Sequence, residues 1–96
     1  MGNVATQERK TRRVSLRIRV PGAREIVLTG DFSEWSDTGV PMKSGAGDEW
    51  VATLSLAPGE YQYRLRVDGM WQNNPEAGRR VPNPFGSEND VLIISW

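Results

Sequence analysis

The sequence predicts an all-β fold, an antiparallel β-sandwich. Stretches of alternating apolar and polar residues recur at least six times, turn-forming residues separate them, and no segment has the apolar spacing of a persuasive helix. A chain of 96 residues is long enough for one modest hydrophobic core, so a single domain is expected.

The first two predicted strands lie near the N-terminus. Apolar residues take every second position from Val14 to Val20, which is the period of a half-buried strand. A Pro-Gly-Ala turn follows, and the next segment places Ile26 and Leu28 on one face of a second strand.

A long connection, residues 30–48, comes next and contains Gly, Ser, Asp and Pro. Asp31 is placed to cap a short helical turn over residues 32–35. Trp35 has two interpretations here, as a loop residue folded onto the sandwich or as a ligand contact.

Residues 49–73 are predicted to form two consecutive hairpins. Trp50 belongs to the inward-facing set of the first strand. Pro58 and Gly59 suit a type II turn, and Asp68 and Gly69 suit a type I′ turn, whose central residues both need positive φ. Residues 74–89 are predicted as a loop, and residues 90–95 as a strand that is apolar on both faces and therefore central or covered.

The register of the second hairpin predicts an outward-facing tryptophan. With a two-residue turn, Trp71 lies opposite Arg66, and directly opposed residues share a face. Because Tyr63 and its alternating neighbours take the core side, Trp71 must stand on the other side with Arg64, Arg66 and Asn73.

An outward Trp71 beside two arginines has two interpretations. The indole can cover the arginine stems and gain a cation–π contribution of about 0.5 to 1 kcal/mol. Alternatively it can be a platform for a ligand with a flat apolar face and a polar edge, which describes both sugars and nucleobases. The hairpin alone leaves both open.

Composition argues against several functional classes. The chain has no cysteine and no histidine, which removes disulfides, thiolate metal sites and the commonest general base, so no catalytic residue, metal ligand or cofactor is expected. Basic and acidic residues number 12 each, so nucleic acid is not an expected partner. No apolar run approaches the length of a membrane span, so no membrane partner is expected, and a cytoplasmic location is predicted.

Charge is unevenly distributed along the chain. Residues 1–13 contain four basic residues and one acidic residue, a net charge of +3. We predict that this segment is a disordered basic tail, the alternative being a tail that touches phosphates, and that residues 14–96 form the folded domain.

Four motifs follow one another along the chain: "LTGDFSEW", "VPM", "EWVATLSLAPGEYQYRLRVDGMWQNNP" and "NPFGSENDVLIIS". The likeness that they carry covers about residues 14 to 94. In this order they resemble the carbohydrate-binding modules of family 48, which include the glycogen-binding domain of the AMP-activated protein kinase beta subunit. The family also includes the domain that precedes the catalytic barrel in isoamylases and branching enzymes. The resemblance implies an immunoglobulin-like sandwich of the early-set type.

The resemblance also implies a set of binding residues. The loop and hairpin tryptophans of family members that bind glycogen fall on Trp35 and Trp71, and the family's basic position falls on Arg64. The family's late loop, Leu-Gly-Thr-x-Asn, corresponds to "FGSEN", which implies an apolar wedge at Phe85 and hydrogen bonds from two polar residues. Those two residues are Ser87 and Asn89.

Four positions depart from the family pattern. Arg64 replaces a lysine with a planar fork, Phe85 replaces a leucine, Ser87 replaces a threonine and Asp90 replaces a second asparagine. Asp90 adds a negative charge near the implied site.

The implied function is non-catalytic binding of α-1,4-glucan, such as glycogen, starch or a maltooligosaccharide, on an open surface. One alternative is an interaction or packing module that docks a glycan-active catalytic domain or a kinase-like subunit. Another is a segment of a larger branching or debranching enzyme.

Overall fold

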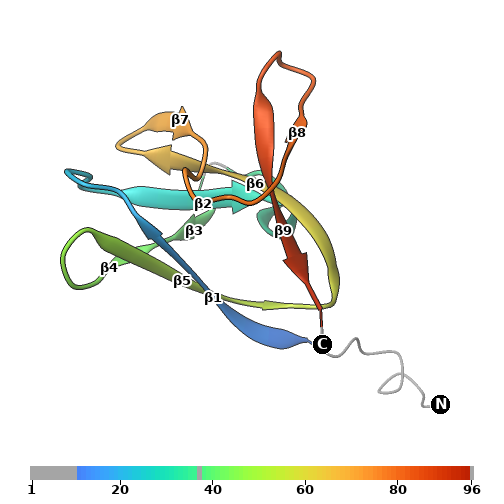
Figure 1. Cartoon of the computed structure of the whole chain (residues 1–96), viewed down its shortest axis with the longest axis horizontal. Coiled ribbons are helices and arrows are strands. Elements are labelled where there is room, and N and C mark those ends of the chain that lie inside the picture. The colour runs from blue at the N-terminus through green and yellow to red at the C-terminus, as the bar shows by residue number, and fades with distance from the viewer. Residues whose placement is uncertain (1–10, 37, 96) are drawn as a thin grey trace.

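The computed structural model describes residues 11–36 and 38–95 as two antiparallel sheets that pack face to face (Figure 1). A single turn of 3-10 helix, η1 at Asp31–Ser33, is the helical content of this described part. The all-β sandwich predicted from the alternating pattern is confirmed, whereas its early-set, immunoglobulin-like character stays a prediction.

The smaller sheet has three strands in the order β1-β5-β4, with the bounds Arg12–Arg19, Glu49–Leu56 and Lys43–Ser44. β1 begins two residues before the predicted domain boundary, because Arg12 and Arg13 pair with Leu56 and Ser55 of β5. Arg12 and Arg13 therefore belong to β1 and not to the tail, whereas the division into a tail and a domain otherwise stays a prediction. Residues 1–10 of that prediction lie outside the described residues.

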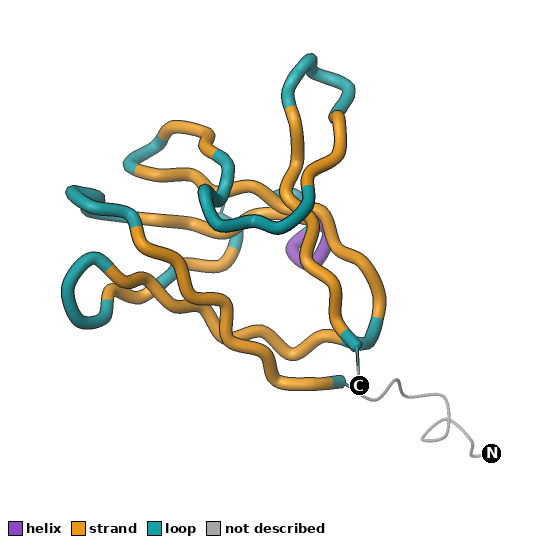
Figure 2. The backbone as a smooth tube through the Cα atoms, in the orientation of Figure 1, coloured by secondary structure: helices purple, strands orange, loops and turns teal. Residues whose placement is uncertain are grey.

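The larger sheet has six strands, with β3, β2, β6, β9 and β8 in that order and β7 paired to β6. The bounds are Val40–Pro41 for β3, Ile26–Gly30 for β2, Gly59–Val67 for β6, Glu88–Ile94 for β9, Arg80–Pro82 for β8 and Met70–Gln72 for β7. β9 lies between β6 and β8, which confirms its predicted central position. Figure 2 shows the β8–β9 hairpin, with its loop, projecting from the body of the sandwich.

The connection between β5 and β6 is not a hairpin, and this prediction was wrong. β5 pairs with β1 and β4 in one sheet, whereas β6 pairs with β2, β7 and β9 in the other. Gly59 has φ of 153°, outside the range that a type II turn needs. The chain crosses from one sheet to the other here, and the Tyr61 hydroxyl donates a 2.6 Å hydrogen bond to the Ala57 carbonyl across the crossing.

The second hairpin, β6–β7, has the predicted register. Trp71 pairs with Arg66, and both turn residues have positive φ, 51° at Asp68 and 86° at Gly69. The two-residue turn therefore fixes which face of the sheet receives Trp71, and this outward placement is confirmed.

The core lies between the two sheets and consists of residues that the alternating patterns direct inward. Trp50 is buried as predicted, and Tyr63 and Leu65 are among the most deeply buried side chains. The core side chains point between the two sheets, so the outer face of the larger sheet carries the alternate residues of each strand. In the described part of the chain, no helix has the length and hydropathy that crossing a bilayer requires.

Candidate functional site

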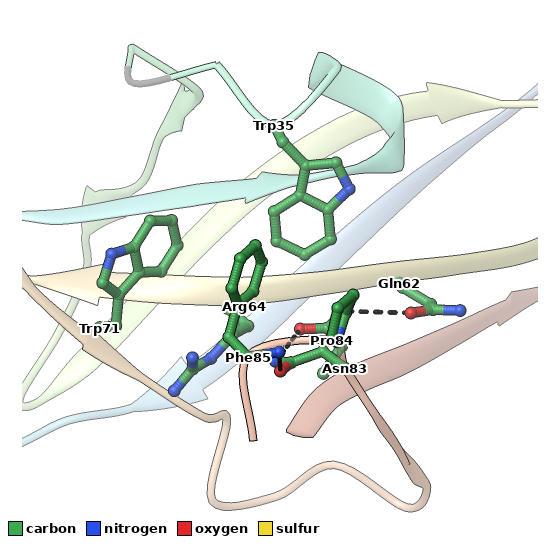
Figure 3. Close-up of a pocket in the computed structure, with 8 residues that line it drawn as sticks. Trp35, Gln62, Arg64, Trp71, Asn83, Pro84 and Phe85 are labelled. Atoms are coloured by element: carbon green, nitrogen blue, oxygen red, sulfur yellow. Dashed lines mark hydrogen bonds between the residues drawn. The ribbon is translucent and has the colours of Figure 1, made fainter. Parts of the chain in front are cut away.

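A groove of about 580 Å³ lies on the outer face of the larger sheet (Figure 3). Side chains from three separate segments of the chain form it, namely the loop after η1, the β6–β7 hairpin and the β8–β9 hairpin. Its lining consists of Trp35, Gln62, Arg64, Trp71, Asn83, Pro84, Phe85 and Asn89.

Trp71 forms one wall of the groove and is 47% exposed. The guanidinium carbons of Arg64 and Arg66 lie 5.8 and 5.6 Å from the centre of its ring system. The arginines therefore contact the indole as the first interpretation expects, while about half of its surface stays accessible, and the ligand platform stays a prediction. The Arg64 Nε is buried and has no hydrogen-bond partner among the described residues.

Trp35 reaches the same groove from the η1 loop and is 36% exposed. Glu34 and Trp35 both have φ of 55°, a left-handed conformation that costs a non-glycine residue about 1 to 3 kcal/mol. This turn redirects the chain so that the indole faces the groove (Figure 3).

Asp31 holds the Trp35 indole in place instead of capping the helical turn. One of its carboxylate oxygens accepts a 3.0 Å hydrogen bond from the Trp35 Nε1, and the other accepts a 2.7 Å bond from the Gln62 backbone N–H. The predicted capping role is wrong because Asp31 is itself the first helical residue, and the Ser33 hydroxyl accepts from the N–H of Gly30 instead. Asp31 thereby links the loop tryptophan to β6.

The Trp35 loop lies over β2, beside Arg64. Thr29 pairs with Arg64 across the β2–β6 ladder, and its hydroxyl donates a 3.0 Å hydrogen bond to the Ser36 carbonyl. At Gly30 a Cβ atom would lie 2.3 Å from the Gln62 carbonyl oxygen, so a side chain there would force the loop away from β6. The observed position of Trp35 therefore requires a glycine at position 30.

Phe85 lies in the loop between β8 and β9, and 91% of its surface is exposed. The side-chain carbonyl of Asn83 accepts hydrogen bonds from the backbone N–H groups of Phe85 and Ser87, at 2.9 and 3.1 Å. These bonds fix the loop backbone, while in Figure 3 the Phe85 ring lies between the rings of Trp35 and Trp71. Three aromatic rings from distant parts of the sequence thus border one opening.

Asn89 is buried, and its amide is already hydrogen-bonded within the protein. Its carbonyl oxygen accepts a 3.1 Å bond from the Asn83 amide nitrogen, and its own nitrogen donates a 3.0 Å bond to the Gln62 carbonyl oxygen. Asn89 therefore lines the groove mainly as a link between the loop and β6.

The structure brings five of the six predicted site residues together and leaves one aside. Ser87 does not line the groove, and its backbone N–H donates to the Asn83 side chain. Three lining residues were missed, namely Gln62, Asn83 and Pro84. The sequence could have indicated Gln62, because it lies two residues before Arg64 and therefore on the same outward face of β6.

Asp90 faces the opposite side of the sheet from the groove and is fully buried. Its carboxylate accepts hydrogen bonds from the Arg80 Nε at 3.0 Å, the Asn74 backbone N–H at 2.7 Å and the Asn73 amide at 3.2 Å. Burial raises the pKa of the Tyr63 hydroxyl, and the charge on Asp90 adds to this. The additional negative charge at Asp90 therefore belongs to a structural network beneath the sheet.

None of the side chains lining the groove among the described residues is a carboxylate. Glycoside hydrolysis commonly needs two carboxylates that flank the scissile bond. The Asp68 carboxylate, in the β6–β7 turn, accepts hydrogen bonds from the backbone N–H groups of Arg24 and Glu25. The described lining of the groove thus consists of aromatic rings, amides, a proline and a guanidinium.

Replacing Asp31 with alanine is expected to release the Trp35 indole without unfolding the domain. The loss of two hydrogen bonds to a partly exposed carboxylate should lower the free energy of unfolding by about 1 to 2 kcal/mol. NMR should show the Trp35 Nε1–H resonance moving upfield and broadening. The matched control is Asp48→Ala at an exposed turn, which should leave that resonance in place; an unchanged resonance in Asp31→Ala would refute the positioning role.

The family described as the glycogen recognition site of AMP-activated protein kinase matches residues 14–95. Protein PTST homolog 2, chloroplastic, of Arabidopsis thaliana is 40% identical over 73 residues, which are 76% of this chain and 13% of that protein. The 5'-AMP-activated protein kinase subunit beta-2 of Homo sapiens is 41% identical over 73 residues, again 76% of this chain and 26% of the relative. The beta-1 subunit of Sus scrofa is 34% identical over the same length, 57% of that sequence. The chain thus spans only a small part of the first two of these relatives.

Proposed function

The chain belongs to the family of the glycogen recognition site of AMP-activated protein kinase, the carbohydrate-binding modules of family 48, and we propose that its groove binds α-1,4-glucan. Members of this family recognise glycan and are not catalytic, so the chain is a recognition module and not an enzyme. Glycogen, starch and maltooligosaccharides are the expected ligands.

One observation supports the proposal above the others. Trp35 and Trp71 come from segments far apart in the sequence, yet both line one open groove, with the guanidinium of Arg64 beside the second indole. An aromatic platform next to donor groups matches a pyranose, which has a face of C–H groups and a rim of hydroxyls. A purely structural tryptophan pair would not need a shared open surface.

In this proposal each side chain has a distinct role. Trp35 and Trp71 stack against sugar rings, Arg64 donates hydrogen bonds to hydroxyls and Phe85 enters beside the chain as an apolar wedge. Asn89 holds the loop and offers its remaining amide hydrogen, and Ser87 makes at most a lesser polar contact. An open site with few hydrogen bonds should bind in the micromolar to millimolar range.

The proposal is tested by titrating isotope-labelled protein with maltoheptaose while following the tryptophan indole and backbone amide resonances. The Trp35 and Trp71 indole signals should move in a saturable way, with a dissociation constant on the order of micromolar to millimolar. A β-linked cello-oligosaccharide serves as the linkage control and should move them far less. Indole signals that stay fixed at millimolar maltoheptaose would show that the groove is not a glucan site.

The names of the relatives favour a second role, in docking a protein partner. Several are beta subunits of a kinase, and this chain matches 26% of their length in beta-2. By analogy the module here could be attached to, or dock, a kinase-like subunit or a glycan-active catalytic domain. Trp71→Ala separates the two roles, because a partner that binds elsewhere on the sandwich should bind the variant unchanged. A cytoplasmic location remains part of this proposal.

A further inference from the structure

A second hollow, of about 340 Å³, lies on the outer face of the larger sheet beyond the groove. Segments around the β6–β7 turn, the start of β2 and the loop before β3 enclose it. Its lining consists of Glu25, Val27, Thr38, Pro41, Arg66 and Gly69. The hollow therefore combines an apolar floor with a carboxylate, a hydroxyl and a guanidinium.

The wall that contains Glu25 is firmly held. One Asp68 carboxylate oxygen accepts hydrogen bonds from the backbone N–H groups of Arg24 at 2.9 Å and Glu25 at 2.8 Å. The Asp68 N–H in turn donates to the Glu25 carbonyl at 2.8 Å. These three bonds fix the β6–β7 turn against the segment before β2, so Glu25 and Gly69 keep their places on two sides of the hollow.

The opposite wall is fixed by a close contact at Gly39. This residue has φ of 47°, and a Cβ atom there would lie 2.6 Å from both the Leu28 carbonyl oxygen and the Val27 side chain. Its N–H donates a 3.0 Å hydrogen bond to the Ser36 hydroxyl, which lies 3.2 Å from the Thr38 hydroxyl. The loop thus presses against β2 and holds Thr38 at the rim.

The Trp71 indole, which lines the groove, lies beside an arginine of the groove and an arginine of the hollow. Arg64 lines the groove and Arg66 lines the hollow, and both guanidinium carbons lie within 6 Å of the centre of the same indole. Residues two apart on a strand point to the same face and are separated by roughly 7 Å. A chain that stacks on Trp71 within the groove can therefore extend along the outer face of β6 into the hollow.

We propose that this hollow is a second glucan subsite, occupied by the part of a longer chain that has passed over Trp71. Glu25 accepts hydrogen bonds from sugar hydroxyls there, Thr38 both donates and accepts, and Arg66 donates. The inference rests on the proposed function of the groove. The second subsite implies that the affinity for glucan rises with the length of the sugar chain, because short oligosaccharides occupy only the groove.

Two titrations followed by NMR test the subsite. Maltotriose at a concentration that saturates the Trp71 indole shift should leave the backbone amides of Glu25, Thr38 and Gly69 in place. Maltoheptaose at matched saturation should move all three. If the indole signals respond to both sugars and these amides respond to neither, the second subsite is refuted and the groove stands. If no signal responds to either sugar, the proposed function itself is wrong.

Variants at the hollow give an independent measure. The double variant Glu25→Gln and Thr38→Val alters exposed side chains and should weaken maltoheptaose binding by about three- to tenfold. The ratio of maltoheptaose to maltotriose affinity should fall by the same factor. Thr53→Val, an exposed threonine on the other sheet, is the matched control and should keep the wild-type ratio. An unchanged ratio in the double variant contradicts the subsite.

Discussion

Trp71→Ala is expected to abolish retention on glycogen while the domain stays folded. A base that stacks on an aromatic side chain gains about 1 to 3 kcal/mol, and a gain of that size for a sugar ring corresponds to roughly a 5- to 150-fold loss of affinity when the indole is removed. The side chain is 47% exposed and lies outside the core, so its removal costs mainly the contacts with Arg64 and Arg66. The free energy of unfolding should fall by only about 1 kcal/mol. Migration in a native gel containing glycogen, together with urea unfolding, measures both effects.

Met70→Ala provides the matched control for Trp71→Ala. Met70 precedes Trp71 in the same short strand and is 69% exposed, but it does not line the groove. Its variant should migrate like the wild type. Global unfolding of Trp71→Ala would show instead that the indole packs for stability, and equal retention of the two variants would remove Trp71 from the site.

Asp90→Ala should cause the largest loss of stability of any substitution considered. Removing a fully buried carboxylate leaves Arg80 and the Asn74 N–H without the acceptor that they share. Leaving the buried Asn74 N–H without an acceptor costs about 1 to 3 kcal/mol, and the lost bonds from the partly exposed Arg80 and from Asn73 add to this, a large fraction of the total stability of a small domain. Urea denaturation followed by circular dichroism measures the change.

Asp48→Ala, at an exposed turn, is the control for Asp90→Ala and should change stability by about 0.5 kcal/mol or less. A second expectation concerns the groove, because the Asn73 amide holds the end of the β7 segment to Asp90 and the Glu88 carbonyl. The folded fraction of Asp90→Ala should therefore bind glucan less tightly. A variant as stable as the wild type would contradict the buried network.

The elements that the sequence predicts best are those set by local chemistry. Alternation over β1, β5 and β6 assigns the core face because strand side chains have a period of two. The turn at Asp68 and Gly69 assigns the register of Trp71 because a two-residue loop permits one pairing. Both features depend on neighbours in the chain, and both are confirmed.

The crossing between β5 and β6 could not be predicted in this way. Residues near Pro58 and Gly59 have the composition of a hairpin turn, and only the partners of each strand decide that the chain changes sheets. Those partners, β1 for one strand and β2 and β9 for the other, are distant in sequence. Sheet assignment is thus a property of the tertiary structure.

The site, like the fold, was predictable from the sequence only in part. Motif order places Trp35, Arg64, Trp71, Phe85 and Asn89, and the structure brings these five side chains to one groove. The role of Asp31 was not predictable, because its second contact is with a backbone N–H 31 positions away. Asn83 and Pro84 were likewise hidden, since their place depends on how the β8–β9 hairpin folds over β6.

The linked amides of Asn83, Asn89 and Gln62 give the groove a fixed direction. Each nitrogen donates to the next carbonyl oxygen, so turning any one amide over would set two donors or two acceptors against each other. The series ends at Gln62, whose carbonyl oxygen accepts from the Asn89 nitrogen. The lining also includes the guanidinium of Arg64, which can only donate hydrogen bonds. A linear sugar chain, whose two ends differ, should therefore lie in it in one sense and not in the reverse.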